Sequence, residues 1–155
     1  QPPGNTSALA IALREMHQIV QDKHARHHLE TQLAQSAAPP LAVVTEPTVA
    51  LSVRQPHAEA ILRGIKTIEY RSTTTSRRGR VLLYASRIPV DDVPHWMKKY
   101  GITDVKYDDL PRGVIVGSVE VYQCDGGEWY LRHPQRATKL LVPKNRPQPI
   151  WFTPF

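Results

Sequence analysis

The spacing of hydrophobic residues changes near residue 48. In residues 8–35, apolar residues from Leu9 to Leu33 recur at helical spacing, which is typical of an amphipathic α-helix. Residues 36–40 end in two prolines, and proline disrupts a helix because it lacks the backbone N–H. We therefore predict an N-terminal helix and proline-containing linker over residues 1–47, and a separate domain over residues 48–155.

In the second region, short apolar runs alternate with turn-forming residues, which is typical of β-strands. Two short helices are expected at residues 56–63 and 90–100. Strands are expected at residues 49–53, 67–71, 80–85, 113–122, 128–132, 138–142 and 150–152. Because no strand–helix–strand unit repeats, this order predicts an α+β or mainly β barrel with short inserted helices, rather than a parallel α/β sheet.

The chain is basic, with a net charge of +6. Positive charge favours a polyanionic partner because binding to phosphates releases counterions, although a mildly basic soluble surface would have the same charge. The single cysteine, Cys124, excludes an internal disulfide and favours a reducing compartment. No run approaches the roughly 20 apolar residues of a membrane span, and the start does not resemble a signal peptide. We predict a cytoplasmic protein without a membrane segment.

The segment at residues 64–71 has the most informative charge pattern. On a strand, residues two apart share a face, so Glu69 and Arg71 point the same way, and Lys66 lies at the entrance. Two cations oriented by a carboxylate can bind a phosphate or the edge of a base. A solvated edge strand would show the same alternation of charge, and the residues alone leave both interpretations open.

Three further arginines follow this segment, at Arg77, Arg78 and Arg80. A loop of this composition attracts backbone phosphates without reading sequence, or it is simply a soluble loop. Glu120 is the second notable carboxylate, because it lies in a strand that is apolar on both faces. Burying an unpaired charge is costly, so Glu120 should face a cleft or pair with a cation such as Lys66, unless it lies on an exposed edge.

Aromatic and histidine residues add two weaker hypotheses. The aromatic residues that could stack on a base are Tyr70, Tyr84, Trp96, Trp129, Tyr130 and Trp151. Most are expected in the core, and Tyr70 is the best exception because it belongs to the charged segment. His24 and His28 are spaced to chelate a metal on a helix, but no third ligand is evident, so we predict no metal site and no cofactor.

Two motifs in order resemble the ASCH domain family of the PUA-like superfamily. They are Ser52-Val-Arg-Gln-Pro56 and Gly64-x-Lys-x-x-Glu-x-Arg71, and the similarity continues through residues 79–85, 117–120 and the C-terminal tail. The resemblance implies a PUA-like β-barrel with a cleft that binds RNA or, in some members, DNA. It also implies that Lys66, Glu69 and Arg71 line this cleft, with Arg54 and Gln55 at its floor.

The function that we predict is binding of nucleic acid, with RNA favoured over DNA, as a single strand or a flipped nucleotide. The predicted binding residues are Arg54, Gln55, Lys66, Glu69, Tyr70, Arg71, Arg77, Arg78 and Arg80. One alternative is an enzyme, either a ribonuclease or an amidohydrolase acting on acetylated cytidine, with Lys66, Glu69 and Glu120 as catalytic residues. Related amidohydrolases have a threonine where this chain has Glu69. The second alternative is a protein-interaction or self-association role for residues 8–35.

Overall fold

The computed structural model describes residues 47–155. The predicted N-terminal helix, its linker and the proposed interaction segment at residues 8–35 lie outside the described residues. Within the described part of the chain, no helix is both long and apolar enough to cross a membrane.

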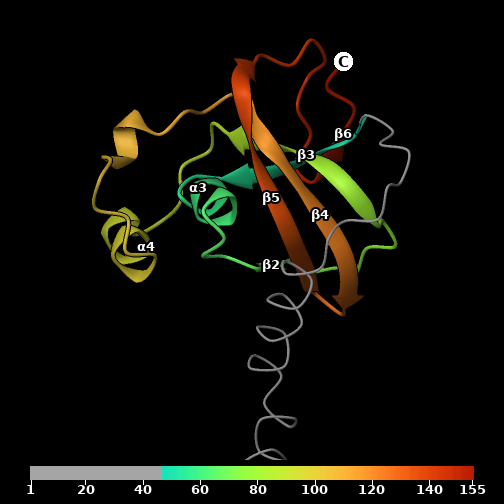
Figure 1. Cartoon of the computed structure of the whole chain (residues 1–155), viewed down its shortest axis with the longest axis horizontal. Helices are drawn as coiled ribbons and strands as arrows, with labels where there is room; N and C mark the ends of the chain where they lie inside the picture. Colours follow the sequence, from blue (N-terminus) through green and yellow to red (C-terminus); the bar gives the residue numbers. More distant parts are fainter. Residues whose placement is uncertain (1–46) are drawn as a thin grey trace, which may run out of the picture. The chain divides into compact units, whose positions relative to one another are not determined.

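The described residues form one six-stranded, mainly antiparallel sheet that curls around the core (Figure 1). The strands are β1 (Ala50–Arg54), β2 (Ile68–Tyr70), β3 (Gly79–Ser86), β4 (Val114–Asp125), β5 (Glu128–Leu141) and β6 (Trp151–Phe152). Their order across the sheet is β2-β5-β4-β3-β1-β6, and β1 with β3 is the parallel pair. The prediction of a mainly β fold with short helices is confirmed at this level.

Two short α-helices and a 3₁₀ turn interrupt the strands: α3 (His57–Leu62), α4 (Val93–Lys99) and η1 (Tyr107–Asp109). Helix α3 packs against β1, β3, β4 and β5, and most of its residues are buried. It ends before Gly64, which adopts a positive φ of 75° that side chains with a Cβ avoid. Helix α4 is shorter than predicted because Asp92 caps it by accepting a hydrogen bond from the backbone N–H of His95.

The main core lies between α3 and the sheet. Its largest member is Trp129, which is fully buried and donates a hydrogen bond from its indole N–H to the Thr73 carbonyl over 3.0 Å. Leu51 of β1, Leu83 of β3 and Val119 of β4 pack in the same cluster. The apolar strands that the sequence predicts thus supply the core.

Strand β5 differs from the prediction. The sequence predicts separate strands at residues 128–132 and 138–142, because His133 and Pro134 interrupt the pattern, but the structure has one strand throughout. The neighbouring strand β4 pairs with it from Ile115↔Leu141 to Asp125↔Glu128. The ladder has three register shifts, and the one between Ser118 and Glu120 of β4 accommodates the positive φ of 52° at His133 and the missing N–H of Pro134.

Candidate functional site

A cavity of about 460 Å³ opens where β1 and β3 end. The parallel pairing of these strands brings Arg54 opposite Ser86, so the chain leaves both strands at the same edge of the sheet. The other walls come from β2 with the residue after it, and from the C-terminal loop at residues 147–149. Four segments that are distant in the sequence therefore meet around one space.

The cavity carries positive charge. Three arginines line it, namely Arg54, Arg71 and Arg87, and Glu69 is the one carboxylate among the described residues that line it. Arg54 and Arg87 are exposed. The polar contact of the Arg54 guanidinium is a long hydrogen bond of 3.5 Å to the Pro89 carbonyl, which leaves most of its donors available to a ligand.

Glu69 and Arg71 form the buried wall of the cavity. Glu69 is 7% exposed; its Oε1 accepts the backbone N–H of Tyr70 over 3.1 Å, and its Oε2 lies 3.6 Å from Nη2 of Arg71. The same Nη2 donates to the Ser52 carbonyl over 2.6 Å. The Ser52 carbonyl thus holds the arginine against β1, and the Glu69 carboxylate lies beside it as an ion-pair partner.

Lys66 lies behind this wall rather than in it. Its Nζ donates to the Ile68 carbonyl over 2.7 Å, lies 3.9 Å from Oε1 of Glu69 and sits 5.1 Å from the centre of the Tyr70 ring. Burial lowers the pKa of Lys66, and the negative charge of Glu69 offsets part of that effect. Lys66 is not among the residues that line the cavity, so it supports Glu69 and Tyr70 from behind.

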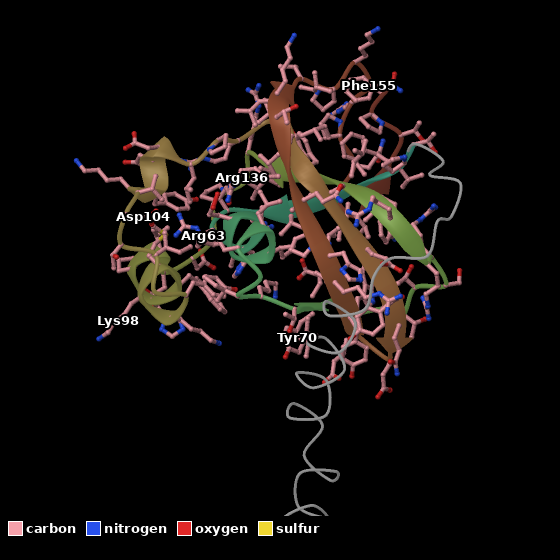
Figure 2. The ribbon with its side chains drawn as sticks, in the orientation of Figure 1. Arg63, Tyr70, Lys98, Asp104, Arg136 and Phe155 are labelled. Atoms are coloured by element: carbon pink, nitrogen blue, oxygen red, sulfur yellow. The ribbon has the colours of Figure 1, made fainter. Side chains whose placement is uncertain are left out.

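Tyr70 is the aromatic residue that the cavity exposes. It is 55% exposed because β2 is an edge strand, and Figure 2 shows it at the lower edge of the sheet. His57 lies on another wall, where its Nδ1 is 2.6 Å from the Tyr100 hydroxyl. Burial, and then the positive charges of Lys66 and Lys99, lower the pKa of His57 to about 4. His57 is therefore neutral at physiological pH and contributes shape rather than charge.

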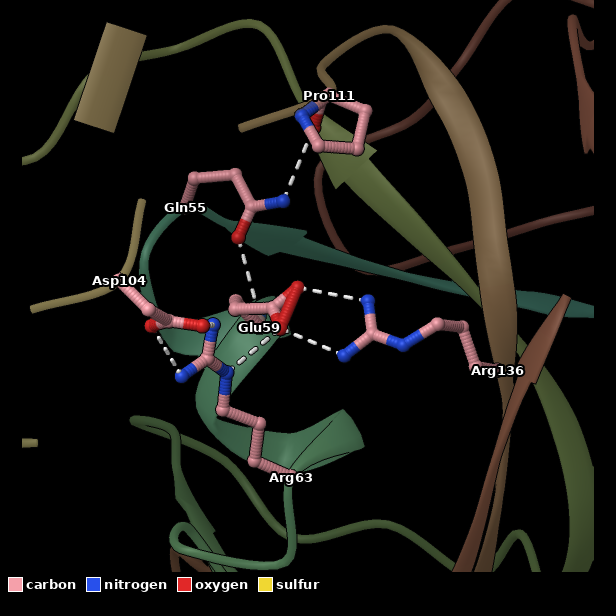
Figure 3. Close-up of polar contacts among 6 residues, drawn as sticks. All are labelled: Gln55, Glu59, Arg63, Asp104, Pro111 and Arg136. Carbon is pink, nitrogen blue, oxygen red and sulfur yellow. Dashed lines mark hydrogen bonds and ion pairs between the residues drawn. The ribbon is translucent and has the colours of Figure 1, made fainter. Parts of the chain in front are cut away.

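Gln55 has a different role from the one that the resemblance implies. It is 1% exposed; its side-chain oxygen accepts the backbone N–H of Glu59 over 3.0 Å, and its Nε2 donates to the Pro111 carbonyl over 2.9 Å (Figure 3). Both ends of the amide are thus occupied by backbone groups. Gln55 begins helix α3 and ties it to the loop before β4, and it is not among the residues that line the cavity.

Glu59 is the centre of a polar network that the sequence does not reveal. Its buried carboxylate accepts two hydrogen bonds from Arg136 of β5, over 2.7 and 2.6 Å, and one from Arg63 over 2.9 Å. Arg63 also forms an ion pair with Asp104, with Nη1 and Oδ1 2.8 Å apart. Figure 3 shows the four side chains joined by these contacts. The spacing of Glu59 and Arg63 on one helical turn is the one signal of this network in the sequence.

The three arginines of the predicted basic loop each have different contacts. Arg80 turns across the sheet and donates to the Ser118 hydroxyl over 2.9 Å and to the His133 carbonyl over 2.8 Å. Arg78 donates to two carbonyls of its own loop, while the guanidinium of Arg77 lies 5.0 Å from the centre of the Trp151 ring. None of the three arginines is among the residues that line the cavity.

Glu120 pairs with Arg132, not with Lys66. Its Oε1 accepts from Nη2 of Arg132 over 2.9 Å, because the two residues are opposite each other in the β4–β5 ladder. The predicted pairing with Lys66 is not formed, because the ion-pair partner of Lys66 is Glu69, and neither Lys66 nor Glu120 is among the residues that line the cavity. Over residues 47–155, no group of three His, Cys, Asp or Glu side chains is arranged to hold a metal ion.

Several residues that line the cavity were not predicted as site residues from the sequence, among them His57, Arg87 and residues 147–149. Arg87 directly follows β3, so its place at the cavity depends on the parallel pairing of β3 with β1. A helix and another strand separate β1 from β3 in the sequence, so no local sequence pattern predicts this pairing.

Comparison with known proteins identifies the described region. The sequence pattern of the ASCH domain family matches residues 51–148 of this chain. Activating signal cointegrator 1 of Homo sapiens and the protein of the same name of Mus musculus are each 35% identical to it over 80 residues. The alignment covers 48% of this chain and 14% of each relative, so the similarity spans a small part of their length.

Proposed function

Because this chain belongs to the ASCH domain family, as the match over residues 51–148 shows, we propose that it binds nucleic acid in the cavity beside Glu69 and Arg71. RNA is the favoured ligand, because the family is generally associated with RNA binding. A PUA-like barrel as the wider fold class and a cytoplasmic location belong to the same proposal.

The charge of the cavity is the observation that carries the proposal. Three arginines surround a space of about 460 Å³, and the carboxylate among the described lining residues already faces Arg71. Arg54 and Arg87 therefore contribute positive charge that no carboxylate of the cavity offsets. Guanidinium groups bind phosphate through paired N–H donors, so a phosphate suits this site better than a neutral ligand.

Size and shape favour an unstacked nucleotide. The volume lies within the range of roughly 300–1,000 Å³ that is typical of sites for one small ligand. A base must leave its stack to enter such a space, and the exposed ring of Tyr70 offers it a new surface for stacking. We therefore favour single-stranded or flipped nucleotides over a regular duplex.

The proposal is tested by fluorescence anisotropy with labelled single-stranded RNA, duplex RNA and DNA over a series of salt concentrations. The double variant Arg54→Ala/Arg87→Ala should bind single-stranded RNA at least tenfold more weakly. Its plot of log affinity against log salt should flatten by about 1.4, since each phosphate contact on a single strand contributes about 0.7.

The matched control is Lys98→Ala/Lys106→Ala, which removes the same charge from exposed positions outside the cavity. Figure 2 shows Lys98 on α4, directed away from the sheet. This control should change the affinity by less than about twofold. Equal losses in both double variants would mean that general surface charge attracts the ligand. No binding of any nucleic acid by the unaltered chain would refute the proposal.

An enzymatic role remains the alternative prediction, as an amidohydrolase on acetylated cytidine or as a ribonuclease. The buried Lys66 with its lowered pKa suits a base or nucleophile, and its neighbour is Glu69. Glu120, the other predicted catalytic residue, is paired with Arg132. Mass spectrometry of modified nucleosides incubated with the chain and with Lys66→Ala tests this alternative, because a product made by both proteins would exclude catalysis by Lys66.

A protein partner is the second alternative, and the name of the two relatives favours it, since a cointegrator acts together with other proteins. The predicted helix at residues 8–35 is the candidate segment in this chain. Removing residues 1–40 should abolish association with a protein partner and leave nucleic-acid binding intact. Loss of nucleic-acid binding in that truncation would contradict this division of roles.

A further inference from the structure

Four side chains form a continuous series of cation–π and ring-stacking contacts. The series runs from the cavity to the loop at residues 72–78. The guanidinium of Arg71 lies 5.7 Å from the centre of the Trp129 ring. Trp129 and Trp151 are stacked with ring centres 5.6 Å apart and planes inclined by 4°. The guanidinium of Arg77 lies 5.0 Å from the centre of the Trp151 ring and completes the series.

The exposed end of this series is Arg77, and its guanidinium is available to a ligand. The backbone of Arg77 is anchored, because its N–H donates to Oγ1 of Thr75 over 3.1 Å and its carbonyl accepts from Nη1 of Arg78 over 2.9 Å. Its side chain is exposed, and within residues 47–155 no hydrogen bond or ion pair occupies the guanidinium. Trp151 thus orients a planar cation whose N–H donors are free.

Trp151 connects the Arg77 end of the series to a wall of the cavity. Arg71 and Pro149 both line the cavity, and Nη1 of Arg71 lies 3.4 Å from the Pro149 carbonyl. Trp151 follows Pro149 by two residues and stacks on Trp129, which Arg71 also contacts. Arg71 and Pro149 therefore link the cavity to Arg77, through the contacts of Trp129 and Trp151.

We propose that Arg77 and Trp151 form a second nucleotide subsite next to the cavity. The base of the neighbouring nucleotide stacks on the guanidinium plane of Arg77, and the phosphate that links the two nucleotides accepts hydrogen bonds from its edge. Trp151 is the positioning residue that holds the plane in place. This inference rests on the proposed function, because it requires one nucleotide of a single strand to occupy the cavity.

The chemistry of the groups favours a base over a simple anion. Arginine guanidinium planes and aromatic rings are the two surfaces on which proteins stack unpaired bases, and here they lie against each other. A phosphate alone would need only positive charge and N–H donors, and a lysine also supplies both, as a point charge. The guanidinium of Arg77, 5.0 Å from the centre of the Trp151 ring, offers a planar face as well as a charge, and replacement of Arg77 by lysine removes the face and keeps the charge.

The test is calorimetric titration of the full chain with a 5′-mononucleotide and with a dinucleotide of the same base. In the unaltered chain the dinucleotide should bind at least tenfold more tightly, since stacking of one base supplies at least a few-fold in affinity and the linking phosphate adds to it. In Arg77→Lys, which retains the charge, the ratio of the two affinities should fall by about fivefold to tenfold. Arg77→Ala should lower it at least as far.

The matched control is Arg112→Lys, because Arg112 also lies over an aromatic ring, that of Tyr107 at 4.4 Å, but does not line the cavity. The ratio should be unchanged in this control. A ratio that stays the same in Arg77→Lys, or that falls equally in Arg112→Lys, would overturn the second subsite and leave the cavity proposal intact. If the unaltered chain binds neither nucleotide, the cavity proposal fails and this inference fails with it.

Discussion

Replacing Glu59 with glutamine should destabilise the domain more than any other isosteric change in the polar network of Figure 3. The Glu59 side chain is 5% exposed and accepts three hydrogen bonds, at 2.6, 2.7 and 2.9 Å, from two arginines. Glutamine keeps the size and one acceptor, but it removes the negative charge. It also turns an NH₂ group toward N–H groups that are themselves donors.

The magnitude follows from the exposure of the partners. Removing one partner of a buried ion pair costs about 3–5 kcal/mol because the remaining charge is left buried. Here the Arg136 side chain is 52% exposed, so water can solvate its charge, and Arg63 keeps its contact with Asp104. We therefore expect Glu59→Gln to lower the free energy of unfolding by about 2–3 kcal/mol, a large share of the roughly 5–15 kcal/mol of a typical domain.

Urea denaturation followed by tryptophan fluorescence measures this loss, since Trp129 and Trp151 lie in or against the core. With a typical slope of about 1–3 kcal/mol per molar urea, the midpoint should fall by about 1 M or more. Asp104→Asn is the control, because the Asp104 side chain is 68% exposed at the outer end of the same network, and it should leave the midpoint almost unchanged. Equal midpoints for Glu59→Gln and Asp104→Asn would refute the reasoning.

The pH dependence gives a second check on the same residue. Burial alone would raise the pKa of Glu59, but the hydrogen bonds from Arg136 and Arg63 outweigh it, so the pKa lies below its ordinary value of 4.5. A lowered carboxylate pKa stabilises the fold fully above pH 4.5 and loses that effect as pH falls through the folded-state pKa. The difference between the unaltered chain and Glu59→Gln should therefore shrink in acid.

Two further predictions concern the walls of the cavity. The pKa of His57 is about 4 in the fold against 6.5 ordinarily, so its contribution is full above pH 6.5 and is lost as pH falls toward 4. Allowing for its partial exposure, thermal melts from pH 4.5 to 7.5 should show about 1–2 kcal/mol of this loss, absent in His57→Gln. Gly127→Ala should cost about 1–3 kcal/mol and weaken RNA binding in the same anisotropy assay, because the new Cβ would collide with the Arg71 carbonyl. Unchanged stability and affinity in Gly127→Ala would show that the backbone around Arg71 adapts.

Local patterns determined much of the secondary structure. Short apolar runs located β1, β3 and most of β4, and Gly64 and Gly101, both with positive φ, directly follow the two predicted helices. These features depend on neighbours in the chain, so a sequence contains them directly. The charge pattern of residues 64–71 likewise placed Glu69 beside Arg71, because two residues on the same face of a short strand are close in any fold.

The partners of the charged residues were decided by the tertiary structure alone. From the sequence, Lys66 was the cation expected beside Glu120, and the register of β4 against β5 selects Arg132 instead. The parallel pairing of β1 with β3 likewise brings Arg87 to Arg54 and makes the cavity, while Gln55 turns inward to begin α3. Long-range register and burial set these contacts, because a charge pairs with whichever opposite charge the fold brings within a few ångströms.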